Sequence, residues 1–123
     1  MKQLLDNCSF GCSVEVAMDA IGGRWKGAIL FHLANGKVQR FGELKKLIPG
    51  INQRMLTTQL RELENCGIVK RTVYPVVPPH VEYELTDFGS SLKPILFQLR
   101  EWGDKYIDHR VAMLEEEQIN ENN

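Results

Sequence analysis

The segment 50–67 carries the start and stop signals of one helix, and it constrains how the rest of the chain can be arranged. Asn52 is a favourable N-cap, because its side-chain oxygen can accept a hydrogen bond from a free N–H of the first turn. Gly67 follows the last periodic residue, where a glycine readily takes the left-handed conformation that ends a helix. A single apolar stripe between them predicts an amphipathic helix, and it consists of Met55, Leu56, Leu60 and Leu63.

The opposite face of this helix is polar and carries hydrogen-bond donors and small hydroxyls, at Gln53, Arg54, Thr57, Thr58 and Arg61. Side chains of these types reach phosphates and the edges of bases in protein–DNA complexes. Taken alone, the pattern favours an ordinary surface helix with a solvated outer face, because most such helices bind nothing. The segments on either side of the helix change that balance.

A short helix is expected at 41–48, directly before Pro49 and Gly50, so a tight turn joins it to the helix that follows. Two helices joined in this way are typical of a helix-turn-helix. After Gly67 the residues become β-branched at 68–74, and 81–85 alternates between apolar and polar. The proline-rich connection between these two strands predicts a hairpin behind the helix-turn-helix, which is the position of a wing.

The predicted fold is mainly α with a small β-hairpin (α+β), a winged helix-turn-helix with terminal dimerisation helices. Lysines would hold phosphates, the second helix would enter the major groove of double-stranded DNA, and the wing would reach the backbone or the minor groove. In the alternative interpretation the hairpin only covers the core and its tip is free. The candidate DNA-binding residues are Lys45, Lys46, Asn52, Gln53, Arg54, Thr57, Thr58, Arg61, Arg71 and His80.

Further helices are expected at both ends of the chain, with Ser13 as the N-cap of a helix over 14–21 and a second helix over 24–33. Thr86 is expected to cap a long C-terminal helix that Pro94 kinks. This helix has a long apolar row, which favours a helix-to-helix dimer seam over packing across its own domain. The seam residues would be Leu92, Ile95, Leu99, Trp102 and Tyr106.

The length of 123 residues predicts one domain, with the helix-turn-helix and wing at 12–91 and the dimerisation helix at 92–118. The ends at 1–11 and 119–123 are expected to be flexible. No apolar run has the length of a membrane span and the first residues do not resemble a signal peptide, so we expect a cytoplasmic protein. The three cysteines form neither a disulfide framework nor a zinc site, and we expect no metal and no cofactor.

The charge of the chain is distributed unevenly although the formal net charge is only −1. The segment 37–71 has eight basic and three acidic residues, a net charge of +5. The segment 101–123 has two basic and seven acidic residues, a net charge of −5. A basic middle segment beside an acidic tail predicts one face that binds a polyanion.

The chain resembles the HxlR-type family of bacterial winged-helix transcription regulators, which are related to the MarR type. The resemblance covers residues from about 12 to 106 and rests on CSV at 12–14, IGGRW at 21–25, RFGEL at 40–44, IPGINQRMLT at 48–57, LRELENCGIVKR at 60–71, PPHVEYELT at 78–86, and Tyr74, Gly89, Leu92 and Pro94. Ser13, Asn52 and Arg54 stand where the family usually has Pro, Ser and Lys. Asn52 is an equally good cap and Arg54 keeps the charge, so these departures do not argue against DNA binding. The resemblance implies a homodimer formed through terminal helices, which acts as a repressor or an activator at a pseudo-palindromic operator.

Cys12 matches a cysteine that senses oxidants or electrophiles in some members of this family. A thiol at a helix N-terminus meets the positive end of the helix dipole, which favours the reactive thiolate. Cys12 is therefore the candidate redox-sensing residue, with Cys8 as a candidate resolving thiol; an electrophile or another small molecule would be the inducer. The alternative is that Cys12 is a small buried hydrophobe.

Two other classes of function stay open at this point. A thiol enzyme would use Cys12 with a histidine base, but the three histidines His32, His80 and His109 are scattered and no nucleophile motif surrounds the cysteine. The other class is a winged-helix interaction module that has lost DNA binding, and the intact basic face from Lys45 to Arg71 argues against it.

Overall fold

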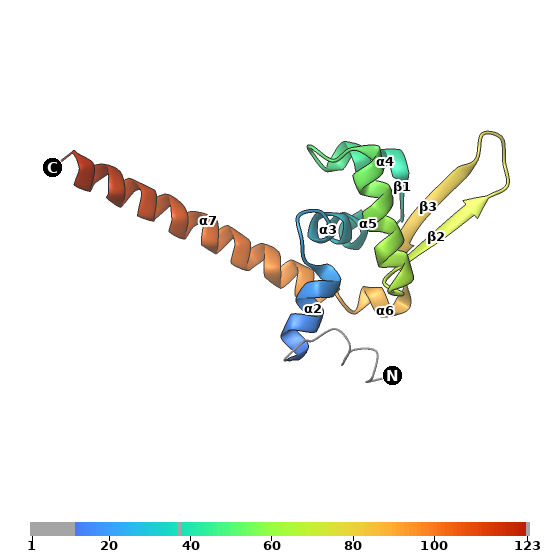
Figure 1. Ribbon diagram of the computed structural model, residues 1–123, viewed down its shortest axis with the longest axis horizontal. Helices are drawn as coiled ribbons and strands as arrows, with labels where there is room; N and C mark the ends of the chain where they lie inside the picture. Colours follow the sequence, from blue (N-terminus) through green and yellow to red (C-terminus); the bar gives the residue numbers. More distant parts are fainter. Residues whose placement is uncertain (1–11, 37, 123) are drawn as a thin grey trace.

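The computed structural model describes residues 12–36 and 38–122, and it places six helices and three strands in that part of the chain (Figure 1). In chain order the elements are α2 (Ser13–Ile21), α3 (Lys26–Gly36), β1 (Val38–Arg40), α4 (Phe41–Leu47), α5 (Gln53–Asn65), β2 (Val69–Tyr74), β3 (His80–Leu85), α6 (Asp87–Ser90) and α7 (Lys93–Glu121). The expected mainly α winged helix-turn-helix is confirmed. The segment 1–11, with Cys8, lies outside the described residues.

The core lies between α3, α4, α5 and the sheet, and every one of these elements contributes its apolar side. Three leucines of α5 are fully buried, whereas Met55 at the edge of the predicted stripe is 39% exposed. On β3 the predicted alternation is confirmed, because Tyr83 is buried and Val81 and Leu85 pack against the same cluster. The core residues that α3 and α5 contribute are Ile29, Leu30, Leu33, Ala34, Leu56, Leu60 and Leu63.

The sheet has three antiparallel strands in the order β1-β3-β2, and the sequence predicted only two of them. The strand β1 is three residues long and pairs Val38 with Glu84 and Arg40 with Glu82. A segment this short carries no detectable alternation, so only the pairing with β3 identifies it as a strand. The expected hairpin is formed by β2 and β3, which pair from Val69 opposite Leu85 to Tyr74 opposite His80.

The C-terminal helix differs from the prediction, because α6 and α7 are separate. Thr86 caps the short α6, where its hydroxyl accepts from the Gly89 N–H at 2.9 Å. Pro94 does not kink a continuous helix; it lies in the first turn of α7. A proline lacks the N–H and clashes with the carbonyl four residues earlier, so a helix beginning at Asp87 cannot continue through it. Once α7 has begun at Lys93 the missing N–H costs nothing.

Other boundaries also differ from the prediction. The second helix, expected over 24–33, is α3 at Lys26–Gly36. The expected N-cap of the first helix was Ser13, but Cys12 occupies that position, with an extended backbone and no capping hydrogen bond from its side chain. The expected end of the C-terminal helix was residue 118, but α7 continues as a helix to Glu121. Within the described residues, no helix is both long and apolar enough to cross a membrane.

Candidate nucleic-acid interface

The turn between α4 and α5 is built by three consecutive residues with distinct tasks. Gly50 takes a left-handed backbone (φ +86°), which a glycine adopts without a steric cost. Ile51 is buried and fastens the turn to the core. Asn52 is confirmed as the N-cap, because its Oδ1 accepts from the Met55 N–H at 2.8 Å. That oxygen is therefore occupied by the helix, and only the side-chain NH₂ of Asn52 is free to approach a ligand.

The five polar side chains that the sequence analysis assigned to the outer face of α5 lie together on one side of the helix, as predicted, and line an open, shallow hollow. The hollow has a volume of about 510 Å³, and the residues that line it are Gln53, Arg54, Thr57, Thr58 and Arg61. The two threonine hydroxyls donate back to the helix, Thr57 to the Gln53 carbonyl at 2.8 Å and Thr58 to the Arg54 carbonyl at 2.9 Å. Each threonine consequently presents a methyl group and an acceptor lone pair, which fit a thymine methyl or a base amino group.

Basic side chains flank this surface on α4. Lys45 and Lys46 are exposed in the last turn of that helix. Arg40, which the sequence analysis did not select, ends β1 and lines a hollow of about 410 Å³ together with Lys46 and Pro79. Its N–H donates to the Glu43 carboxylate at 3.0 Å and caps α4. Because β1 was not predicted, nothing in the sequence indicated that Arg40 would lie between α4 and the wing.

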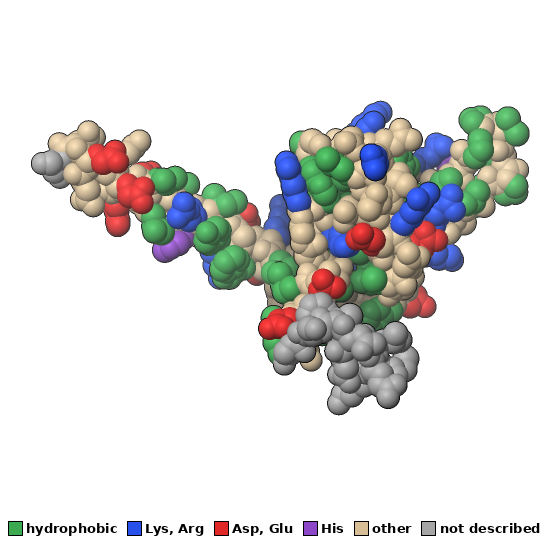
Figure 2. Space-filling model, viewed as in Figure 1, with side chains coloured by type: hydrophobic (Ala, Val, Ile, Leu, Met, Phe, Trp, Pro, Cys, Tyr) green, Lys and Arg blue, Asp and Glu red, His purple; other side chains and the backbone are tan. Residues whose placement is uncertain are grey.

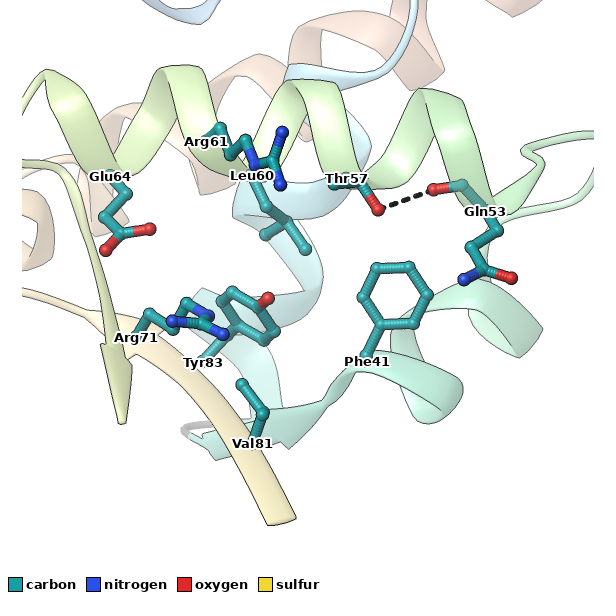
Figure 3. Close-up of a pocket in the computed structure, with 9 residues that line it drawn as sticks. All are labelled: Phe41, Gln53, Thr57, Leu60, Arg61, Glu64, Arg71, Val81 and Tyr83. Carbon is teal, nitrogen blue, oxygen red and sulfur yellow. Dashed lines mark hydrogen bonds between the residues drawn. The ribbon is translucent and has the colours of Figure 1, made fainter. Parts of the chain in front are cut away.

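A groove of about 390 Å³ lies between α5 and the sheet (Figure 3). Arg71 of β2 lines this groove together with residues of α5. Arg61 on α5 and Arg71 on β2 lie on its two sides, and Phe41, Leu60, Val81 and Tyr83 form its apolar floor. No ion pair of either arginine is recorded in the part of the chain that the structure describes. Both guanidinium groups can therefore bind an external anion.

The wing differs from the prediction at His80. Its Nε2 lies 2.9 Å from the Glu82 carboxylate, and its ring meets the Tyr74 ring edge-on at 5.2 Å between centroids. The hydrogen bond from His80 is the main reason that the pKa of Glu82 is lowered from its ordinary value. A hydrogen bond with the Glu82 carboxylate, and its charge, raise the pKa of Tyr74. His80 thus has an internal partner, whereas Arg71 does not.

Positive charge gathers on one part of the domain. Figure 2 shows lysine and arginine side chains over the part that contains α4, α5 and the base of the hairpin. Residues 72–92 contain no lysine or arginine, and the loop 75–79 at the outer end of the hairpin consists of prolines and valines, with Val77 fully exposed. The charge that can attract a polyanion therefore surrounds the polar face of α5.

A second surface lies on α7, which leaves the domain soon after it begins (Figure 1). Its N-terminal part is held by buried Leu96 and by Phe97, whose ring meets Phe31 at 5.9 Å between centroids. Its 29 residues span about 43 Å at 1.5 Å per residue, and Leu96 is the one buried residue among them. The interpretation that this helix packs across its own domain is therefore wrong.

The candidate seam residues lie largely where the sequence placed them. Ile95, Leu99, Trp102 and Tyr106 are all exposed on α7, and the rings of the last two are stacked at 5.3 Å. Leu92 is different, because it precedes α7 and packs partly buried against the core of its own domain. Further exposed apolar side chains that the sequence analysis did not select are Ile107, Val111 and Leu114 on α7 and Val14 and Met18 on α2.

Cys12 is exposed, so the interpretation that it is a small buried hydrophobe is wrong. It lies at the N-terminal end of α2, a helix with no fully buried residue. Cys66, at the C-terminal end of α5, is also an exposed free thiol. In the described part of the chain, no group of three or more His, Cys, Asp or Glu side chains is arranged to hold a metal ion.

Comparison with known proteins relates this chain to one family. The model of the HxlR-like helix-turn-helix family matches residues 20–111. The HTH-type transcriptional regulator YdeP of Bacillus subtilis (strain 168) is 55% identical over 105 residues, which are 85% of this chain and 80% of YdeP. A solved structure of the redox regulator HypR in its reduced form has a TM-score of 0.77 and 50% identity, covering 82% of this chain and 99% of that one. Diamide-treated YodB from B. subtilis has a TM-score of 0.63 and 38% identity, covering 77% of this chain and 94% of that one. The chain belongs to the HxlR-like helix-turn-helix family.

Proposed function

We propose that this chain is a homodimeric, sequence-specific DNA-binding transcriptional regulator that acts in the cytoplasm on double-stranded operator DNA. The observation that carries the proposal is the polar face of α5, where five side chains able to reach DNA lie together and line one open hollow. Its relatives support the proposal, because YdeP bears the name of an HTH-type transcriptional regulator.

Each group on the interface has a role that follows from its chemistry. Arg54 and Gln53 are long donors in the first turn of α5, the end that a recognition helix presents to the major groove. Arg54 is suited to the O6 and N7 of a guanine, and Gln53 to the N6 and N7 of an adenine. Lys45, Lys46 and Arg71 are positioned to neutralise phosphates on either side.

The homodimer is supported by the exposed apolar surface of α7. Monomeric proteins rarely expose a long apolar row, and such a row usually marks an interface. Two copies related by a two-fold axis would bury the Ile95–Tyr106 row of both chains and present two α5 helices to the half-sites of a pseudo-palindromic operator. The exposed residues of α2 would add to the same interface.

The experiment that tests the proposal is a fluorescence-anisotropy titration with an operator duplex that the wild-type protein selects from a random-sequence pool, beside a scrambled duplex. Lys46→Ala should weaken binding to both duplexes alike and lower the slope of log affinity against log salt by about one unit. Arg54→Ala should instead reduce the discrimination between duplexes by about 1–3 kcal/mol at one base position. Equal affinity of the wild type for the two duplexes would contradict sequence-specific binding.

A second candidate function, thiol sensing by Cys12, is favoured by the exposure of this thiol at the end of an unburied helix. HypR and YodB support it, since the former is named a redox regulator and the latter has been studied after diamide treatment. Diamide should abolish operator binding by the wild type and leave Cys12→Ser unaffected. If both proteins respond alike, Cys12 is not the sensor and the inducer is another small molecule.

A further inference from the structure

The loop that joins α2 to α3 contacts the turn in front of the recognition helix. The Arg24 guanidinium lies over the ring of Trp25, 4.4 Å from its centroid. Trp25 in turn borders Gly50, where a side-chain Cβ would lie only 3.7 Å from the Trp25 ring. This loop therefore packs against the residues that precede the N-terminal end of α5.

The next residue of the same loop region reaches the other end of α5. Lys26, the first residue of α3, places its Nζ 2.5 Å from the Glu62 carboxylate, 36 residues away in the chain. The side chain of Lys26 is only 15% exposed, although lysines normally extend into water, and that of Glu62 is 50% exposed. This ion pair is thus shielded on the lysine side and joins α3 directly to the recognition helix.

The junction between α2 and this loop is a close turn of the backbone at Gly22. The Gly22 N–H donates to the Met18 carbonyl at 2.7 Å, and a Cβ at Gly22 would lie only 2.1 Å from that same oxygen. A side chain at this position would collide with the Met18 carbonyl, so the close return of the chain at the end of α2 requires a glycine. The loop after α2 thus contacts α5 near both of its ends. Trp25 borders Gly50, in the turn before α5, and Lys26 pairs with Glu62 near the C-terminal end of α5.

We propose that Lys26 is a positioning residue for sequence recognition, which sets the orientation of α5 through its ion pair with Glu62 and does not contact DNA. The inference rests on the proposed function. A helix that pivots by a small angle misplaces base-reading side chains such as Arg54, because their hydrogen bonds are directional, whereas phosphate contacts tolerate the movement. Loss of the ion pair should therefore reduce discrimination between sequences more than it reduces binding to DNA in general.

The test compares Lys26→Met with Glu62→Gln, which remove the same ion pair from opposite sides. Both variants should lower the ratio of operator to scrambled affinity about fivefold, the upper range for a half-exposed ion pair, and leave the salt slope unchanged. A phosphate contact by Lys26 predicts a different pattern. Lys26→Met would then weaken both duplexes and lower the salt slope by about one unit, while Glu62→Gln would strengthen binding to both. That pattern would overturn the proposal.

Matched variants separate positioning from a general loss of structure. Glu84→Gln removes a carboxylate from a looser pair, 3.9 Å from the Lys70 Nζ on the sheet, and should leave the affinity ratio unchanged. The exchanged pair Lys26→Glu/Glu62→Lys should restore part of the ratio. An exchanged pair that behaves like the sum of its two single changes would show that the ion pair has no such role.

A measurement without DNA keeps this inference distinct from the proposed function. Hydrogen exchange of the α5 amides in the free protein should become about fivefold faster in both Lys26→Met and Glu62→Gln, because the helix opens locally more often. Unchanged exchange in both variants overturns the positioning role even if the wild type binds its operator. If exchange is faster in both variants but the wild type shows no preference for any DNA sequence, the proposed function is refuted and the ion pair still positions α5.

Discussion

Trp102 is the residue through which the proposed dimer can be tested most directly. Its side chain is 62% exposed on α7, with the Tyr106 ring stacked on it at 5.3 Å. A tryptophan has roughly 250 Å² of surface, so docking of a second copy would remove about 150 Å² from water. At about 25 cal/mol per Å² this burial is worth about 4 kcal/mol for each copy, and real interfaces recover part of that value. Each Trp102→Ala should therefore cost about 2 kcal/mol at least, the usual threshold of an interface hot spot.

The two-fold symmetry of a dimer doubles this cost, because both copies carry the change. A total of about 4 kcal/mol raises the dimer Kd about a thousandfold, which sedimentation equilibrium at micromolar concentration can resolve. Val77→Ala is the matched control, because Val77 is fully exposed at the wing tip on the other side of the molecule from α7 (Figure 1). Far-UV circular dichroism should show that both variants remain folded. A dimer Kd that is unchanged in Trp102→Ala, or equally changed in Val77→Ala, would refute the reasoning.

Two further predictions concern stability and pH. Asn52→Ala removes the 2.8 Å hydrogen bond to the Met55 N–H and should lower the free energy of unfolding by about 1 kcal/mol in urea denaturation, while Asn52→Ser, which restores a capping oxygen, should recover most of it. Unfolding free energies that are equal for Asn52→Ala and the wild type would show that the cap contributes nothing. His80→Ala should raise the pKa of Glu82 in a ¹³C NMR titration, because the hydrogen bond from His80 is the main cause of its lowered pKa. Since the folded-state pKa of Glu82 is depressed, its contribution to stability is present above the ordinary glutamate value of about 4.3 and is lost as the pH falls through the folded value. An identical Glu82 titration in the two proteins would contradict this cause.

The groove that contains Arg61 and Arg71 is built by two elements that are separate in the chain. Arg61 belongs to α5 and Arg71 to β2, and the groove between them exists only because the hairpin folds back beside the helix (Figure 3). The same hairpin carries no further cation toward its tip. The positive charge of this part of the chain is therefore concentrated close to α5, and the outer end of the hairpin carries valines and prolines.

The sequence alone was sufficient for the elements whose signals are local. The ends of α5 follow from a capping hydrogen bond within one turn and from Gly67, which has the expected positive φ of +76°. The hairpin follows from the alternation of Val81, Tyr83 and Leu85 and from the prolines between the strands. Each of these signals acts over a few residues, so it can be read without the rest of the chain.

Only the tertiary structure decided the features that join distant segments. The strand β1 exists because three residues pair with β3, more than 40 positions away, and that pairing places Arg40 beside the wing. The partner of Lys26 is Glu62, 36 residues away in the chain, and no periodicity indicates that contact. The apolar row of α7 was visible in the sequence, but its exposure was not, because burial depends on where the other helices lie. Local hydrogen bonds and side-chain spacing thus determined the elements, and long-range packing determined which of their faces remain free to bind.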